Sequence, residues 1–353
     1  MEPRPEPTTA TWQSSNFTTL RDKPIRKMVL PGSHNSGSNS ISVSKYGIGP
    51  FSPVPTCLGF FFERWSICQE CDIATQLLMG IRYIDLRVSK HHITKELHTE
   101  HTVYGEPLIG LLNQINNFIT THEGEMVVLF LNNFRGADLT TVEDHEPVIE
   151  LLESVFISHE SIAVKPDEFD LPLGTLKARN RSLCILYANE DVVKHHLSTS
   201  RISILSPSKT LLDKWFNASS TTTLFKSITD FLPAMREESA RITVLQAILS
   251  PRPLTTVCGF LVLLPRLLFC FLFKCAFVPQ NLGMMADKVN KQTGNFIEEQ
   301  SNFKPSVVLI DGLPGLGAKG VIKATLALNS IIIDKNGKGE SEIDLENRLK
   351  SPS

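Results

Sequence analysis

Short apolar runs alternate with amphipathic stretches along most of this chain. Apolar or alternating runs that predict strands lie at residues 27–30, 81–88, 97–103, 126–131, 182–187, 202–205, 242–248 and 307–310. Stretches in which apolar residues recur with a helical period lie at residues 73–78, 108–118, 148–156, 210–216 and 224–231. About eight strands in α/β alternation are typical of a parallel barrel. The pattern therefore predicts an α/β fold, a distorted TIM-type (β/α)8 barrel, in a single domain.

The two ends of the chain differ from this pattern. Residues 1–20 begin with a polar, proline-rich stretch that has no apolar signal-peptide core, and we expect a disordered lead-in. Residues 334–353 are polar and charged, and we expect a loose tail. The barrel is then expected over residues 21–333.

An apolar insert at about 254–279 interrupts the alternation. Its centre, Val257–Phe273, is rich in leucine and phenylalanine but carries Pro265 and Arg266 in the middle. A spanning helix needs about 20 apolar residues and tolerates such a charge poorly. A buried outer helix of the barrel, an element lying in a membrane interface and a transmembrane helix all remain open.

Composition limits the class of protein. A hydrophobic fraction of 42%, a charged fraction of 20% and a formal net charge of −2 indicate a globular protein without a nucleic-acid-binding charge excess. The one close cysteine pair, Cys68 and Cys71, lacks a second pair, so reduced thiols are favoured over zinc. Reduced thiols suit the cytosol, and we expect a cytoplasmic protein.

Four polar side chains stand where predicted strands end. His34 follows Gly32 at the exit of the first strand, Asp85 and Arg87 lie on the second, and His101 closes the third. Catalytic groups of α/β barrels gather at such ends. An arginine can hold a phosphate, while one neutral and one charged imidazole can take and give a proton. The set therefore favours acid–base catalysis on a phosphodiester.

Longer motifs around these residues resemble the X domain of phosphatidylinositol-specific phospholipases C, and most of all the small X-domain-only proteins of animals. The resemblance covers roughly residues 20–330, and its motifs lie at residues 31–36, 65–69, 80–87, 97–104, 125–134, 244–246 and 306–311. It implies a distorted TIM barrel that cleaves the glycerol–phosphate bond of a phosphoinositide, with a membrane surface as the place of action. We infer no obligate protein partner, and a cytoplasmic protein peripheral at membranes is expected.

The resemblance also implies a role for each site residue. His34 matches the general base, His101 the general acid and Arg87 the phosphate-binding arginine. Asp311 matches an aspartate that orients the base, and Asp85 is expected to order the site. The residues expected to contact the substrate are Asn35, Asn133, Tyr187 and Trp215, although core packing is an equal alternative for the two aromatic ones.

The second strand also bears on calcium. The large calcium-dependent relatives place two acidic ligands two residues apart, whereas this chain has Asp85 followed by Arg87. A guanidinium repels a divalent cation and can replace its charge, so we expect no metal and no other cofactor. Asn35 stands after His34 as in the large calcium-dependent relatives, whereas the bacterial members of the resembling family have an aspartate there. Glu100 is expected either to point away from the barrel or to perturb His101.

Three functions remain open. The first is a metal-independent phosphoric diester hydrolase or lyase acting on an inositol phospholipid. The second is a glycerophosphodiester-type phosphodiesterase, a class that uses a carboxylate-bound metal and is disfavoured by Arg87. The third is a catalytically weak barrel that binds phosphoinositide headgroups.

Overall fold

The computed structural model describes residues 9–50, 59–135, 139–158, 161–197, 200–252, 281–300, 302–333 and 339–341. The apolar insert expected at about 254–279 lies outside these ranges, so its three interpretations stay open. No helix within the described ranges combines the length and the apolar character needed to cross a bilayer.

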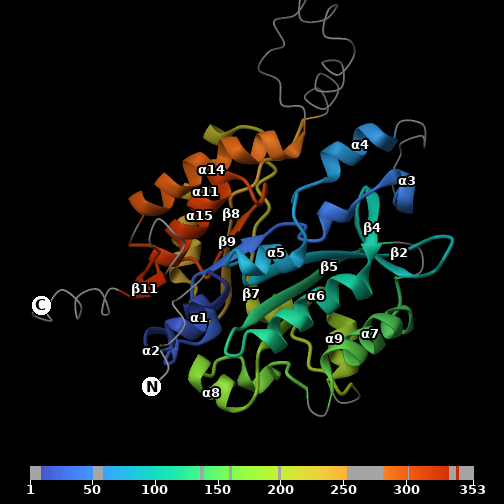
Figure 1. Ribbon diagram of the computed structural model, residues 1–353, viewed down its shortest axis with the longest axis horizontal. Coiled ribbons are helices and arrows are strands. Elements are labelled where there is room, and N and C mark those ends of the chain that lie inside the picture. The colour runs from blue at the N-terminus through green and yellow to red at the C-terminus, as the bar shows by residue number, and fades with distance from the viewer. Residues whose placement is uncertain are drawn as a thin grey trace, which may run out of the picture.

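Seven parallel strands form an incompletely regular barrel with helices around it (Figure 1). Their order is β6-β5-β2-β1-β9-β8-β7, and a parallel bridge from Leu205 to Leu186 extends the β6 side. The fold is the distorted TIM-type barrel that the α/β alternation predicts. The strands are β1 (Leu30–Ser33), β2 (Tyr83–Lys90), β5 (Val127–Arg135), β6 (Leu183–Tyr187), β7 (Leu211–Leu212), β8 (Ile242–Gln246) and β9 (Val307–Ile310).

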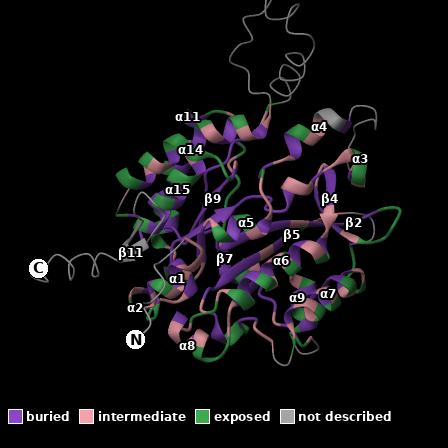
Figure 2. Cartoon of the chain, viewed as in Figure 1, coloured by how far each residue is buried: buried purple, intermediate pink, exposed green. Residues whose placement is uncertain are grey.

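The outer helices bury one face against these strands and expose the other (Figure 2). Helix α6 (Leu108–Thr121) is an example, because its apolar positions three and four residues apart are all buried. The other helices are α1 (Trp12–Ser15), α2 (Phe17–Leu20), α3 (Val43–Tyr46), α4 (Gly59–Ser66), α5 (Ile73–Leu78), α7 (Glu146–Phe156), α8 (Leu173–Ala178), α9 (Glu190–His196), α10 (Pro207–Thr210), α11 (Thr221–Glu237), α14 (Leu282–Glu299) and α15 (Leu316–Ala327). An antiparallel pair, β10 (Ile331–Ile333) and β11 (Gly339–Ser341), follows α15 and takes in part of the expected tail.

The first strand begins three residues later than predicted. Residues 25–27 form a 3₁₀ turn, and the strand extends through Gly32 to Ser33. Gly32 does not bend the backbone but lies between β2 and β9. A Cβ there would approach Val307 Cγ1 to 2.8 Å and Tyr83 Cβ to 3.2 Å. The glycine is therefore needed for close strand packing, and His34 follows directly at the barrel rim.

The third predicted strand is an antiparallel hairpin rather than a barrel strand. Strand β3 (Leu97–His101) pairs with the end of β2, and β4 (Val103–Pro107) pairs with β3. Thr102 turns the chain at the tip, with φ of 69°. His101 therefore reaches the barrel mouth from a hairpin tip, which corrects the expectation of a third parallel strand end.

Two further predicted elements are wrong. Of residues 202–205 only Leu205 makes a strand bridge. Residues 210–216 are not a helix, because α10 ends at Thr210, β7 takes the next two residues and the chain then runs as a loop. A strand of two residues is too short to show a period of two. Asp213 and Trp215 lie in this loop.

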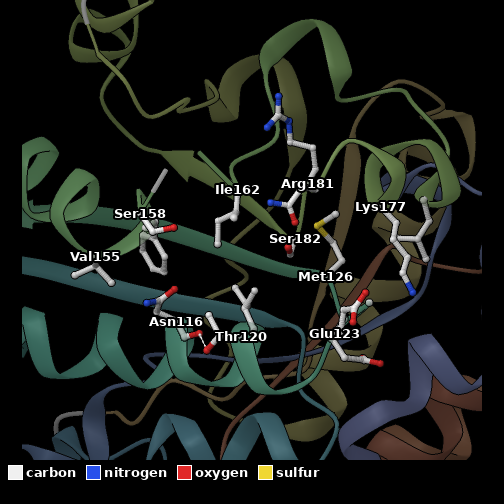
Figure 3. Close-up of a pocket in the computed structure, with 16 residues that line it drawn as sticks. Asn116, Thr120, Glu123, Met126, Val155, Ser158, Ile162, Lys177, Arg181 and Ser182 are labelled. Atoms are coloured by element: carbon white, nitrogen blue, oxygen red, sulfur yellow. Dashed lines mark hydrogen bonds between the residues drawn. The ribbon is translucent and has the colours of Figure 1, made fainter. Parts of the chain in front are cut away.

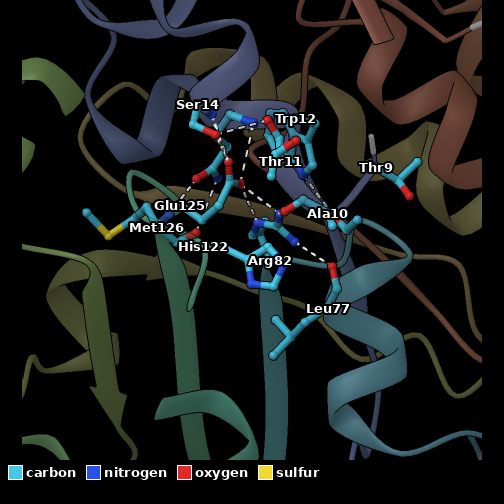
Figure 4. Close-up of polar contacts among 12 residues, drawn as sticks. Thr9, Ala10, Thr11, Trp12, Ser14, Leu77, Arg82, His122, Glu125 and Met126 are labelled. Carbon is cyan, nitrogen blue, oxygen red and sulfur yellow. Dashed lines mark hydrogen bonds and ion pairs between the residues drawn. The ribbon is translucent and has the colours of Figure 1, made fainter. Parts of the chain in front are cut away.

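Residues 9–20, expected to be disordered, are ordered, and Figure 4 shows the first of them gathered around Arg82 and Glu125. They form a 3₁₀ turn (Thr9–Thr11) and helices α1 and α2, and the indole of the fully buried Trp12 donates to the carbonyl of Gly80 at 3.0 Å. Ser14 donates through its backbone N–H and its hydroxyl to the Glu125 carboxylate, at 2.8 and 2.7 Å. Residues 1–8 lie outside the described ranges.

A buried ion pair holds this N-terminal segment in place. The Arg82 guanidinium binds the Glu125 carboxylate at 2.7 Å, and both side chains are fully buried. Its remaining N–H groups donate to the carbonyls of Ala10, Leu77 and Ile81. Every guanidinium donor therefore has an acceptor, which is the condition under which a buried ion pair is tolerated.

Candidate active site

The carboxyl ends of the parallel strands meet around two adjoining cavities. The larger, of about 780 Å³, is bordered mainly by polar side chains such as Asp85, Asn133 and Asp213. The smaller, of about 240 Å³, is bordered by apolar side chains together with His101 and Asp311. His34, Arg87 and Trp215 line both cavities. The structure thus brings together His34, Asp85, Arg87, His101 and Asp311, which the sequence predicts as catalytic.

His34 and Asp311 form a buried pair at this rim. His34 Nδ1 lies 3.0 Å from Asp311 Oδ1, and Gln69 Nε2 donates to the backbone carbonyls of His34 and Ile310 at 2.8 and 2.9 Å. Burial by itself disfavours the imidazolium, but the Asp311 carboxylate, together with Cys68, outweighs it and raises the pKa of His34 to about 10. His34 is therefore protonated at neutral pH in the free protein.

His101 has the opposite electrostatic environment. Its Nδ1 donates to the Ser66 carbonyl at 2.8 Å, and its ring lies 6.3 Å from that of His34 between centroids. Burial, reinforced by the nearby charge of Arg87, lowers the pKa of His101 well below its usual value of 6.5. One imidazole of the pair is thus charged and the other neutral, as a phosphodiester reaction requires, but in the reverse of the expected assignment.

Arg87 supplies a permanent positive charge at the site. It lines both cavities, and its buried Nε has no hydrogen-bond acceptor among the described residues. A buried guanidinium N–H without an acceptor is costly, whereas a bound oxyanion satisfies it. The geometry therefore fits a phosphate held between the two histidines.

Two asparagines position the Asp85 carboxylate. Oδ2 accepts from the backbone N–H of Asn35 at 3.1 Å, and Oδ1 accepts from the side chain of Asn132. Asn35 has φ of 44° and is buried, so it shapes the turn after His34 and does not line either cavity. Asn133 lines the larger cavity and donates to Asn132 Oδ1 at 2.7 Å. Asp85 belongs to neither of the compact metal-ligand clusters that the described residues form.

The structure separates the two aromatic candidates. Trp215 is about half exposed at 47%, lines both cavities and stands 5.7 Å from the His34 ring. Tyr187 is fully buried, stacks on Phe134 and has its hydroxyl 2.6 Å from His145 Nδ1. Tyr187 borders neither cavity, and of the two expectations for it the structure shows core packing.

Two residues at the site were missed by sequence reasoning. Asp213 follows β7 in the loop predicted as a helix, lines the larger cavity and accepts from Gln246 Nε2. Burial, with a smaller effect of Asp85, raises its pKa to about 6. Cys68 lies in the chain beyond α4, where its Sγ stands 3.6 Å from His101 Nδ1. Asp213 has no local pattern that distinguishes it from an ordinary helix-face residue, and the sequence shows Cys68 only as one member of a close pair with Cys71.

Glu100 is folded into the hairpin tip. It is buried, its Oε1 accepts from the backbone N–H of Thr102, and its Oε2 lies 3.8 Å from Arg135. Burial raises the pKa of Glu100, and the charge of Arg135 opposes the shift. Glu100 thus stabilises the turn at Thr102, the residue after His101, by accepting a hydrogen bond from its backbone.

A separate cavity of about 370 Å³ lies at the opposite end of the barrel (Figure 3). Met126 and Ser182, which precede β5 and β6, place it beneath the strands. Its cations are already engaged, since Arg181 binds Glu168 at 2.7 Å and Lys177 lies 5.0 Å from the Phe17 ring centroid. This cavity has no arrangement comparable to the two histidines and arginine at the rim.

Comparisons with known proteins give one consistent result. Residues 60–202 match the family model described as PI-PLC X 1. Human PI-PLC X domain-containing protein 2 is 28% identical over 261 residues, which cover 71% of this chain and 80% of that protein. A PI-PLC X domain-containing protein of Dictyostelium discoideum is 35% identical over 109 residues, 31% of this chain, and this chain spans 19% of its length.

A solved structure matches the fold. Phosphatidylinositol-specific phospholipase C from Listeria monocytogenes superposes with a TM-score of 0.59 at 15% identity, covering 90% of this chain and 98% of that one. At this identity the likeness concerns the fold alone. It agrees with the TIM-type barrel, while the sequence matches agree with the resemblance seen in the motifs.

Proposed function

We propose that this chain, whose residues 60–202 match the PI-PLC X family model, is a phosphodiesterase that cleaves the glycerol–phosphate bond of an inositol phospholipid. The observation that carries the proposal is the position of Arg87. Its unsatisfied buried Nε lies where a polar and an apolar cavity meet, with His34 and Asp311 lining the apolar side together with His101. An amphiphilic phosphodiester has the same order of parts: polar headgroup, phosphate and lipid.

The geometry supports one sequence of steps. The inositol ring occupies the larger cavity, the phosphate binds Arg87, and the glycerol end enters the smaller cavity beside Trp65 and Leu249. His34 takes the proton of the inositol 2-hydroxyl, whose oxygen attacks phosphorus. The bond from phosphorus to the glycerol oxygen breaks, and His101 protonates that oxygen. The products are a cyclic inositol phosphate and diacylglycerol.

Asp311 fixes which nitrogen of His34 can react. With the Nδ1 proton directed at Asp311 Oδ1, the Nε2 atom is the one left to face substrate. Asp311 thereby also makes His34 a strong base. The single proton shared by the two histidines lies mostly on His34. The reactive form, with His34 neutral and His101 charged, is therefore the less populated of the two. Phosphate binding favours it, since an added anion counters the Arg87 charge that, together with burial, keeps His101 neutral.

The proposed reaction uses no metal ion. Arg87 occupies the position on β2 where an acidic ligand would be needed, and the Asp85 oxygens already accept two hydrogen bonds. The same features disfavour a glycerophosphodiester-type enzyme, which requires a carboxylate-bound metal.

Access of lipid is proposed on the side of the smaller cavity. Pro251 and Leu282, which both line it, flank the residues outside the described ranges, and these contain the apolar run Val257–Phe273. We propose that the lipid enters from this side, so that the smaller cavity faces the membrane surface where a phosphoinositide resides.

A catalytically silent headgroup-binding barrel is the second candidate. The observation that favours it is the resting charge of the histidines, because a protonated His34 beside Arg87 binds an anion well without taking a proton. Such a protein would hold the headgroup and release no product.

One assay separates these functions. The purified protein is incubated with phosphatidylinositol in mixed vesicles, with and without EDTA, and products are followed by ³¹P NMR. Cyclic inositol phosphate formed at the same rate with EDTA supports the proposal. Headgroup binding without product after long incubation supports the silent barrel, and EDTA-sensitive cleavage of a glycerophosphodiester supports the metal-dependent alternative.

A further inference from the structure

Three potential metal ligands meet at the rim beside the cavities. The ligand atoms of His34, Cys68 and Asp311 all lie within 4.8 Å of one another, and all three side chains are buried. Imidazole, thiolate and carboxylate are the ligands that structural and catalytic Zn²⁺ sites use. Cys71, the neighbour that suggests a cysteine pair in the sequence, is not part of this cluster.

Hydrogen bonds fix the backbone of each ligand. The Cys68 carbonyl accepts from the Gly312 N–H at 2.8 Å, and the Cys68 N–H donates to Ser38 Oγ at 3.0 Å. The Asp311 carbonyl accepts from Asn290 Nδ2 at 2.8 Å, and His34 N–H donates to the Ile310 carbonyl at 3.0 Å. A ligand set held by its backbone in this way needs little rearrangement to close on an ion.

A second observation concerns Asn35. Its Nδ2 lies 3.4 Å from Cys68 Sγ, while its buried Oδ1 has no partner among the described residues. An amide that donates to a cysteine sulfur stabilises the thiolate, which is the form that binds metal. The side chain is therefore placed as an outer partner of a metal-bound thiolate.

We propose that His34 Nδ1, Cys68 Sγ and an Asp311 carboxylate oxygen bind a thiophilic divalent cation of the Zn²⁺ class, and that this ion inhibits the enzyme. The inhibition rests on the proposed function, whereas the binding does not. On binding, the thiol loses its proton and the metal takes the place of the proton on His34 Nδ1. The two anionic ligands offset the charge of nearby Arg87.

Inhibition follows from the tautomer of His34. The base needs its proton on Nδ1, directed at Asp311, and a free lone pair on Nε2. With a metal on Nδ1, the neutral ring carries its proton on Nε2 and cannot accept another there. The ion also takes Asp311 away from His34. The pocket thus contains an ion site that is incompatible with catalysis, and Cys68 is the ligand that makes it selective for soft metals.

The experiment uses the full chain, reduced and freed of metal by EDTA. Co²⁺ is titrated into wild type, Cys68→Ser and the matched control Cys71→Ser, and the thiolate-to-cobalt charge-transfer band is recorded before Zn²⁺ is added to displace it. We expect the band in wild type and Cys71→Ser, and at least about 100-fold weaker binding in Cys68→Ser, since losing a ligand costs more than losing an outer partner. Cys68→Ala replaces the serine variant if that one does not fold.

Each outcome decides one part. No band in wild type, or equal bands in wild type and the folded Cys68 variant, overturns the site. The activity of each form is also measured with and without Zn²⁺. Zn²⁺ should lower the activity of wild type and Cys71→Ser at concentrations at which it does not change the activity of the Cys68 variant. Zn²⁺ that binds through Cys68 without inhibiting overturns the regulatory part. If no form cleaves lipid, the proposed function fails while the cobalt titration still tests the site.

Discussion

The rings of His34 and His101 lie 6.3 Å apart between centroids, yet their surroundings drive their pKa values in opposite directions. Asp311 holds the proton on His34, whereas burial and Arg87 exclude a proton from His101. The pair therefore carries one proton over a wide range of pH. Both the charge needed to protonate a leaving oxygen and the lone pair needed to take a proton are available within that range.

The first prediction concerns the pH dependence of kcat/KM. The pair loses its single proton only as pH rises through the pKa of His34, about 10, and gains a second only below that of His101. We expect a broad plateau through neutral pH, an acid limb below 6.5 and an alkaline limb near pH 10. Asp311→Asn should move the alkaline limb to lower pH, because the carboxylate that raises the pKa of His34 is gone. An alkaline limb near pH 7 in wild type, or one that Asp311→Asn does not move, would contradict this account.

The second prediction concerns the histidines themselves. His34→Ala and His101→Ala should each reduce cleavage of phosphatidylinositol about 10²- to 10⁴-fold, the range for general acid–base groups. His92→Ala is a suitable control, because His92 is exposed beyond the end of β2. Rates are measured by release of cyclic inositol phosphate, with unfolding curves to show that the variants are folded. Near-wild-type rates in both site variants would refute the mechanism.

Sequence reasoning reached the barrel because short continuous apolar runs such as residues 126–131 and 307–310 fit strands that are buried on both faces, and they alternate with helical stretches. It reached His34 and Arg87 because strand ends converge in a parallel barrel, whereas Asp311 came only from the family resemblance. It misplaced His101 on a barrel strand, since the hairpin depends on the left-handed turn at Thr102, which no hydrophobic pattern reveals. It missed Asp213 because β7 has two residues, and Cys68 because its role depends on partners more than 30 residues away on either side.

The third prediction separates Trp215 from Tyr187. Trp215 lines both cavities, so Trp215→Ala should raise KM for the lipid with a smaller effect on stability. Tyr187→Phe should leave KM unchanged but lower the free energy of unfolding by about 1–3 kcal/mol, because His145 Nδ1 loses its buried partner. Steady-state kinetics and urea unfolding measure the two effects. A change in KM for Tyr187→Phe without a loss of stability would restore Tyr187 as a headgroup contact.

The fourth prediction concerns the N-terminal segment. Glu125→Ala leaves Arg82 as a buried charge without its carboxylate and removes the acceptor of Ser14. We expect the free energy of unfolding to fall by about 3–5 kcal/mol. Glu123→Ala, two residues away and exposed, is the control and should change it by less than about 0.5 kcal/mol. Equal stability of the two variants would mean that residues 9–20 do not depend on the ion pair.

The last prediction tests the phosphate clamp. Arg87→Lys keeps the positive charge but loses the planar fork that can donate two parallel hydrogen bonds to one phosphate. A hydrogen bond to a charged group contributes about 1.5–3 kcal/mol, so kcat/KM should fall about 10- to 100-fold. Arg135→Lys is the matched control, because Arg135 also lines the larger cavity but is partly exposed and lies 3.8 Å from Glu100. Its loss should stay below about fivefold, since lysine keeps the charge beside Glu100 and an ion pair with one partly exposed partner contributes at most about 1 kcal/mol. Equal losses in the two variants would show that the cavity needs positive charge in general, and the fork of Arg87 would then have no special role.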